Sequence, residues 1–297
     1  MAMDPQQLRT FVAVVDESSF SAAARALGYT QSAVSQHIAA LEADLDATLL
    51  TRRPVAPTEA GRRLLEHARP LLLRLDAARA DVARLRQVRP GRLAVVCTPG
   101  ALTPAVADAL VGARTAAPLR AVSVRVCDRD QAVRAVSTGA ADAALVDGAV
   151  APSDPLPLPD AGPLTAFAVA QEPLAVLLPV AHPLAGRRGL RLPDLSAARW
   201  IDAPDVTVAL TQLRAVAQTD GFGPQLAFLG GDFAGLGALV AAGGGLTTAA
   251  LSAATGMPGV TAVPITEPRI VHRVELLHPR APGAAAAELA DALRPSR

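Results

Sequence analysis

The N-terminal part of the chain carries apolar residues at helical spacing. A first helix is predicted from apolar residues at intervals of three and four, which are Leu8, Phe11, Val12 and Val15. A short second helix is predicted from an N-cap at Ser21 to Leu27, where Gly28 permits a tight turn. Thr30 then caps a third helix, whose apolar face comprises Val34, Ile38, Leu41 and Leu45. Two short helices joined by a glycine-containing turn predict a helix-turn-helix.

A long helix is predicted after the basic, proline-bearing segment 49–57, which suits a small wing or a turn. From Thr58 onwards, apolar residues are spaced alternately by four and three, at Leu64, Ala68, Leu71, Leu75, Ala78, Val82 and Leu85. This seam is typical of a two-stranded coiled coil, although an amphipathic helix lying on its own domain would show a similar pattern. Pro70 removes one helical hydrogen bond, so a kink is expected there.

Beyond the segment "RPGR" (89–92), strand-like apolar runs alternate with helical patterns. Strands are predicted at 93–97, 122–126, 143–146, 174–179, 226–229, 260–265 and 273–278. Helices are predicted near 103–114, 130–138, 207–219 and 233–242. This alternation indicates mainly parallel, buried sheets and an α/β class. The segment 151–163 carries five prolines and is predicted to connect two lobes.

Composition narrows the function classes. All 28 basic residues are arginine, which excludes Schiff-base chemistry and the lysine of a phosphate-binding P-loop. The 297 residues suffice for about two domains. We find neither a run of about 18 uncharged apolar residues nor a signal sequence, so a cytoplasmic protein without membrane contact is expected. Residues 1–92 hold 13 arginines against 10 acids, which is a weak sign of nucleic-acid binding.

The third predicted helix presents uncharged hydrogen-bonding side chains to the outside. Burial of its apolar face leaves an outward row near the helix N-terminus, formed by Gln31, Ser32, Ser35 and Gln36. A helix fits the major groove of DNA, and its first turns approach the base edges. Arg52 and Arg53 would neutralise phosphates, which position a protein without reading sequence. A polar helix face that is merely solvated is the alternative.

The N-terminal region and several later segments of the chain resemble those of a known protein family. Residues 4–88 look like the N-terminal region of LysR-type transcriptional regulators, through "QLRTFVAVVDESSFSAAARALGYTQSAVSQHIAALEADLDATLL" and "PTEAGRRLLEHA". The segments 139–146, 172–201 and 239–246 resemble the effector-binding domain of that family. The implied fold class is α plus α/β: a winged helix-turn-helix (1–58), a dimerising linker helix (59–89) and a two-lobed domain (90–297) similar to type 2 periplasmic binding proteins. Its first lobe would span about 90–162 and 266–297, and its second about 163–265.

The resemblance also implies the activity, a homodimer or homotetramer that binds inverted repeats in double-stranded promoter DNA. A small-molecule effector between the lobes would change that binding, with no cofactor, metal or catalytic residue. The implied DNA-binding residues are Ser21, Thr30, Gln31, Ser32, Ser35, Gln36, His37, Arg52 and Arg53. The chain departs from its relatives at Ser32, Gln36 and His37, and the wing segment is about two residues short.

The effector site is expected beyond the carboxyl ends of the strands. Thr98 offers a hydroxyl, Gly100 allows close backbone approach, and the helix N-terminus that follows could hold an anion. With the positions that the family suggests, the candidate set is Thr98, Pro99, Gly100, Ala101, Asp147, Ala203, Asp205 and Asp232. An effector with an amino group is a further hypothesis, suggested by three acids at or near the cleft, although loop acids commonly serve as helix caps: Asp202, Asp205 and Asp232.

Other interpretations stay open at this point. Cys97 and Cys127 end two strands that should be neighbours, which allows a redox switch, although buried and inert thiols are more common. We find no motif of a hydrolase, metalloprotease or nucleotide-binding enzyme. His272 and His278 flank one strand and suggest ordinary packing or surface, and His182 a structural role. A ligand-independent DNA-binding repressor and a solute-binding module are the remaining rivals.

Overall fold

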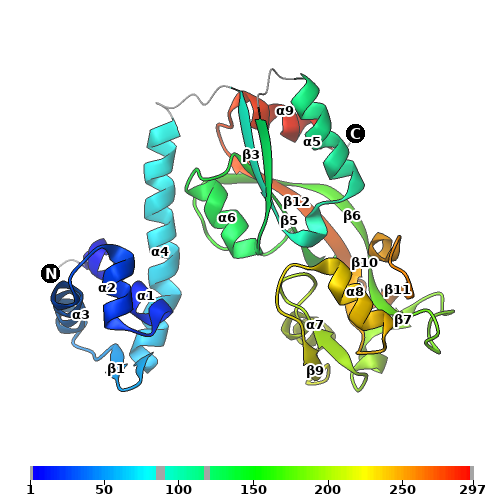
Figure 1. Ribbon diagram of the computed structural model, residues 1–297, viewed down its shortest axis with the longest axis horizontal. Coiled ribbons are helices and arrows are strands. Elements are labelled where there is room, and N and C mark those ends of the chain that lie inside the picture. The colour runs from blue at the N-terminus through cyan, green and yellow to red at the C-terminus, as the bar shows by residue number, and fades with distance from the viewer. Residues whose placement is uncertain (1–2, 85–90, 117–120, 295–297) are drawn as a thin grey trace. The chain divides into compact units, whose positions relative to one another are not determined.

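The computed structural model describes residues 3–84, 91–116 and 121–294 (Figure 1). The chain divides into two compact units, of which the first comprises Met1–Ala83 with Asp160–Gly162 and the second Arg84–Pro159 with Pro163–Arg297. The two units have separate hydrophobic cores. No helix within the described ranges is long and apolar enough to cross a membrane.

Three helices open the first unit: α1 (Pro5–Glu17), α2 (Phe20–Leu27) and α3 (Gln31–Leu45). Thr30 caps α3 as predicted, because its Oγ1 accepts from the Ala33 amide at 3.2 Å. The cap of α2 is Ser19 and not Ser21, since Ser19 Oγ accepts from the Ala22 amide at 3.2 Å. Gly28 ends α2 in the left-handed region at φ +69°, which is the tight turn expected there.

A short hairpin and a long helix complete the first unit. β1 (Leu50–Arg52) and β2 (Val55–Pro57) pair antiparallel, and α4 (Glu59–Arg84) follows (Figure 1). The helix continues through Pro70, and the kink expected there stays a prediction. The core forms where α1, α2 and α3 pack against β1 and the first half of α4, and includes Leu8, Phe11, Val34, Ile38, Leu41, Leu50 and Leu72.

The predicted heptad seam of α4 divides into two parts. Ala68 is fully buried and Leu64 packs against the core of the first unit, so the first positions of the seam belong to that core. Three apolar side chains further along are exposed by 49%, 38% and 57%: Leu71, Leu75 and Val82. Leu85, the last position, lies outside the described residues. The first half of the seam therefore packs on its own domain, whereas the coiled-coil interpretation of the second half stays a prediction.

A mixed eight-stranded sheet organises the second unit, with strand order β4-β3-β5-β12-β6-β11-β7 and β10 paired to β6. The strands are β3 (Arg92–Cys97), β4 (Ala121–Val126), β5 (Ala143–Val150), β6 (Leu164–Pro179), β7 (Leu190–Arg191), β10 (Thr247–Ala250), β11 (Val260–Glu267) and β12 (Val271–Pro279). β3 pairs in parallel with β4 and β5, whereas β6 and β12 pair antiparallel with each of their neighbours. The expectation of mainly parallel sheets is wrong because β12 inserts between β5 and β6.

β6 belongs to both lobes of this unit. Residues 164–173 pair with β12, whereas residues 174–179 pair with β10 and β11. The sequence indicated a strand only at 174–179, whereas β6 begins ten residues earlier, at Leu164. The apolar pattern did not predict residues 164–173 as part of the strand, because these residues include polar side chains and are mostly half-buried.

Helices cover the sheet in each lobe. The first lobe carries η1 (Pro99–Ala101), α5 (Pro104–Ala116), α6 (Arg129–Ser137) and α9 (Ala284–Ala292). The second carries η2 (Leu192–Leu195), α7 (Leu210–Ala217), α8 (Phe233–Ala241), η3 (Leu251–Ala254) and the parallel pair β8 (Trp200–Asp202) and β9 (Pro224–Ala227). Trp200 is fully buried in the second lobe, where its Nε1 donates to the Leu195 carbonyl at 2.9 Å.

Candidate DNA-binding and effector sites

The outer face of α3 carries the polar residues that were predicted to read DNA. Val34, Ile38 and Leu41 are fully buried and fix the rotation of the helix. Gln31, Ser32 and Gln36 are consequently exposed, while Ser35 is half-buried. The Ser32 hydroxyl bonds the Thr30 hydroxyl at 2.9 Å, which ties the first turn of α3 to its cap. The exposed row thus lies at the helix N-terminus, the end that approaches base edges in a major groove.

His37 does not share that exposed row. Its Nδ1 lies 3.0 Å from the hydroxyl of Thr10, a buried residue of α1. Its ring meets Tyr29 edge to face, with 5.6 Å between the ring centroids. The sequence grouped His37 with the DNA-facing residues, whereas these contacts turn its ring towards the domain. His37 therefore positions α3 against α1, a role that depends on the packing of α1 and is not visible in helical spacing.

Ser21 and the wing arginines are also exposed. Arg52 stacks its guanidinium over the ring of Phe20, 4.9 Å from the centroid, so it packs as well as carrying charge. Arg53 is exposed at the tip of the hairpin. Thr51 Oγ1 donates to the Pro54 and Ala56 carbonyls at 2.7 and 3.1 Å and so stabilises the turn between the two arginines and β2.

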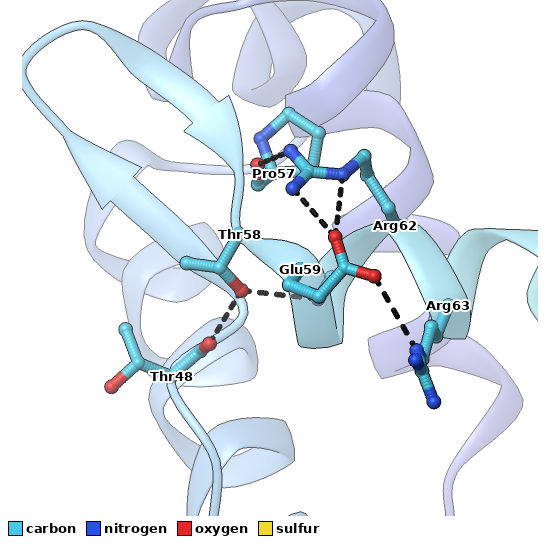
Figure 2. Close-up of polar contacts among 7 residues, drawn as sticks. Thr48, Pro57, Thr58, Glu59, Arg62 and Arg63 are labelled. Carbon is cyan, nitrogen blue, oxygen red and sulfur yellow. Dashed lines mark hydrogen bonds and ion pairs between the residues drawn. The ribbon is translucent and has the colours of Figure 1, made fainter.

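A polar network joins the hairpin to the start of α4 (Figure 2). Thr58 Oγ1 accepts from the Gly61 amide at 3.1 Å and donates to the Thr48 carbonyl at 2.7 Å. Glu59 accepts from Arg62 Nη2 at 2.7 Å, and Arg62 Nη1 also donates to the Pro57 carbonyl at 3.2 Å. These side chains fix the direction in which α4 leaves the hairpin. From the sequence, Thr58 was predicted only as the start of the helix.

The second unit contains a cavity of about 290 Å³ between its two lobes. The first lobe contributes the ends of β3 and β5 and the start of α6, and the second contributes the loop 204–209 and Gln212 of α7. Four of the predicted effector residues line it: Thr98, Pro99, Asp147 and Asp205. The rule that ligands bind beyond the carboxyl ends of the strands (the strand-end rule) therefore predicted the position of this cavity.

The other four predicted residues do not line the cavity. Ala101 and Ala203 are fully buried in the cores. Gly100 lies behind Asp147, and a Cβ at this position would overlap the Asp147 carboxylate. Asp232 caps α8 by accepting from the Gly235 amide at 3.0 Å, which is the helix-cap role weighed above. Asp202 likewise accepts from the Leu210 amide at 3.2 Å and is absent from the lining.

Residues that the sequence analysis did not single out complete the lining, chief among them Asp128, Arg129, Asp130, Gly148 and Gln212. Asp128 caps α6, its Oδ1 accepting from the Gln131 amide at 2.7 Å. Gln212 Nε2 donates to the Ala149 carbonyl at 2.8 Å and so links the two lobes. The acids at 128 and 130 follow directly on β4, so a strict use of the strand-end rule would have found them.

A buried polar cluster forms the floor of the cavity. Thr98 Oγ1 donates to Asp147 Oδ1 and accepts from the Asp147 amide at 3.0 Å. Asp147 Oδ2 lies 2.7 Å from Nε2 of His272, which is 4% exposed. His272 was expected to be ordinary packing or surface, yet it contacts a cavity residue 125 positions away. The imidazole therefore contacts the carboxylate and not the Thr98 hydroxyl.

The two cysteines lie side by side, as expected. β3 and β4 are parallel neighbours, and the Cys127 amide donates to the Cys97 carbonyl at 2.9 Å. Both thiols are free. Burial raises the pKa of the Cys97 thiol to about 11, with smaller contributions from Cys127 and Asp147. Burial also raises the pKa of Cys127. Both groups are therefore protonated at neutral pH, which is the unreactive form of a thiol.

Comparison with known proteins identifies the class. Residues 5–62 match the profile "Bacterial regulatory helix-turn-helix protein, lysR family", and residues 86–296 match the profile "LysR substrate binding domain". Together these matches cover most of the chain. The protein belongs to the LysR family of bacterial regulators, with an N-terminal DNA-binding part and a C-terminal effector-binding domain.

Individual relatives agree with this assignment. A "Probable hydrogen peroxide-inducible genes activator" of Mycobacterium xenopi is 34% identical over 61% of this chain and 92% of the relative. The "Uncharacterized HTH-type transcriptional regulator YnfL" of Escherichia coli is 31% identical, and the match covers 68% of this chain and 66% of the regulator. The solved structure of full-length CbnR "complexed with the target DNA complex" has the same fold, with a TM-score of 0.54, 21% identity and coverage of 98% and 99%.

Proposed function

We propose that this protein binds a promoter sequence through the exposed row of α3 and the hairpin, and that a small molecule in the cavity between the lobes modulates that binding. The observation that supports this most directly is that one chain carries both a correctly capped α3 and a cavity floored by Thr98 and Asp147. Two chains paired through α4 would place two copies of α3 about 34 Å apart, one helical turn of DNA. The effector acts only through its differential affinity for the two states of the protein.

We propose binding and not catalysis for the cavity, and a cytoplasmic location where promoter DNA is accessible. The relatives are transcriptional regulators. The hydroxyl of Thr98 is engaged with Asp147, and His272 contacts only the far side of that carboxylate among the described residues. A ligand would therefore be held by fixed dipoles and charges.

Substitution at α3 and at the hairpin tests the DNA-binding proposal. Gln31→Ala is expected to cost about 1–3 kcal/mol on the operator and little on random DNA, because a base contact carries sequence information. Arg53→Ala is expected to weaken binding on both DNAs and to flatten the salt dependence, because a phosphate contact releases counterions. Arg53 is preferable to Arg52, which also packs on Phe20.

Footprinting and titration at several salt concentrations measure both effects. Arg188→Ala is the matched control, because Arg188 is exposed and lies in the second unit, outside the proposed DNA-binding surface. Equal loss on operator and random DNA for Gln31→Ala would contradict its base-reading role.

A thiol-based peroxide response is not part of the proposal, although it would match the name of the M. xenopi relative. With the pKa of Cys97 raised to about 11, labelling by iodoacetamide is expected to be slow at pH 7 and to accelerate towards pH 11. The raised pKa of Cys127 acts in the same direction. In denatured protein both thiols should label near their ordinary pKa of about 8.5. Mass spectrometry after peroxide treatment shows whether the thiols have reacted. A Cys97–Cys127 disulfide would refute the expectation that both thiols are unreactive at neutral pH.

A further inference from the structure

The cavity between the lobes has an acidic lining, and its charge bears on which effector it binds. Four carboxylates and one guanidinium face it, which gives a formal charge of −3: Asp128, Asp130, Asp147, Asp205 and Arg129. The remaining lining residues are neutral. Four carboxylates around about 290 Å³ repel one another in the absence of a cation.

The groups that suit an anion are already occupied by the protein itself. The sequence offered the Thr98 hydroxyl, close backbone approach at Gly100, and a following helix N-terminus that could hold an anion. In the structure the Asp147 carboxylate takes that place, held by the Thr98 hydroxyl on one oxygen and by His272 Nε2 at 2.7 Å on the other. It also fills the space beside Gly100, where a Cβ would overlap it. An external carboxylate or phosphate would have to displace an internal one.

The single arginine of the lining is partly engaged with the protein backbone. Arg129 Nη2 donates to the main-chain carbonyl of Asp147. Its guanidinium lies against Gly148, where an added Cβ would overlap Nη2. Its Nε is buried and has no hydrogen-bond partner among the described residues. The guanidinium is therefore directed at the backbone at the end of β5 and offsets part of the surrounding negative charge.

Three carboxylates of the lining retain acceptor capacity. Asp128 and Asp205 each bind one backbone amide, Gln131 at 2.7 Å and Gly230 at 2.9 Å, through one carboxylate oxygen. Asp130 is exposed in the first turn of α6. An ionised carboxylate can accept about four hydrogen bonds, so these groups can receive N–H donors from a ligand. Hydrogen bonds from a cationic N–H to a carboxylate are about twice as strong as neutral ones.

We propose that the effector is an organic cation, a small molecule with a primary ammonium or guanidinium group on a short apolar body. The cationic group would meet Asp130 and Asp205, and the apolar body would contact Pro204, Val206 and Val208. This inference rests on the function proposed above and adds the chemical class of the ligand. In this proposal the Asp147 carboxylate is a negative charge of the protein itself and forms part of the floor of the site.

A series of probes with equal length and different charge tests this class. The full chain is titrated by calorimetry with 1,5-diaminopentane, glutarate and 1,5-pentanediol, which differ mainly in charge. We expect the diamine to bind and both other probes to fail. Asp205→Asn and Asp130→Asn are expected to weaken diamine binding by about tenfold or more, because a hydrogen bond to a charged group contributes about that factor. Asp130 is exposed, so its variant does not depend on refolding of a buried site.

The control is Asp220→Asn. Asp220 is an exposed acid of the second lobe, as Asp205 is, but it does not line the cavity, so its replacement should leave diamine binding unchanged. Binding of glutarate in preference to the diamine, equal binding of all three probes, or no binding of the diamine would each overturn the proposed class. Operator binding is measured in parallel, with and without each probe. If glutarate binds and changes operator affinity, the proposed function stands and only the cation proposal fails.

Discussion

Replacing Gly61 with alanine is expected to destabilise the DNA-binding unit by about 3 kcal/mol or more. Gly61 lies in the first turn of α4, where an added Cβ would overlap the Leu49 carbonyl oxygen and lie 3.2 Å from the Pro57 side chain. The same carbonyl accepts from the Thr58 amide at 2.9 Å, so moving it breaks the junction between hairpin and helix. A backbone carbonyl cannot move aside as the end of a flexible side chain can. A loss of this size in the free energy of unfolding is a large part of the stability of a domain.

Thermal unfolding followed by circular dichroism measures this effect. Gly112→Ala provides the matched control, because Gly112 also lies within a helix but has nothing within 4 Å of an added Cβ. Alanine is favoured over glycine in a helix by about 0.5–1 kcal/mol, so this variant is expected to be neutral or more stable. Similar unfolding of wild type and Gly61→Ala would show that the Leu49 carbonyl tolerates the methyl group.

Replacing Leu75 with glutamate is expected to dissociate the dimer that we propose to form through α4. Each copy of Leu75 has 38% of its surface left to bury in a dimer, which contributes about 0.6–1.1 kcal/mol, and a two-fold interface contains two copies. The loss of about 1–2 kcal/mol raises the dissociation constant roughly 5- to 30-fold, and the cost of burying the glutamate charge adds to it. Leu75 is 38% exposed in the single chain, so glutamate is accommodated without disturbing the core of the first unit.

Analytical ultracentrifugation measures the dissociation, and footprinting shows whether both half-sites of the operator are still occupied together. Leu229→Glu is the control, since Leu229 is 79% exposed in the second unit and lies outside α4. An unchanged dimer with paired half-site protection would place the dimer contact elsewhere.

Local signals made α3 predictable. The spacing of its apolar residues, the cap at Thr30 and the turn at Gly28 all act within a few residues, so the sequence reveals them directly. The cap of α2 shows the limit of this approach. Serines stand at positions 18, 19 and 21, close to the start of α2. Ser19 is the cap because Phe20 must be the first helical residue for its ring to enter the core.

The cavity between the lobes was predictable only in its location. Thr98 follows the end of β3, and the strand-end rule finds such a residue without knowledge of its partners. Its bond to Asp147 spans 49 positions, and the bond from Asp147 to His272 spans 125. Those contacts depend on the register of β12 against β5, where His272 pairs with Ala149. A strand register of this kind follows from tertiary packing, which no local pattern in the sequence records.

The placement of two aromatic residues makes the two units distinguishable by spectroscopy. The chain has one tryptophan and one tyrosine. Trp200 is buried in the second unit, with its ring 5.3 Å from Phe222, while Tyr29 lies in the first unit beside His37. Tryptophan emission excited at its red edge therefore reports only on the effector-binding domain, whereas the tyrosine signal belongs to the DNA-binding unit. Unfolding of each unit has an optical signal of its own, without any added label.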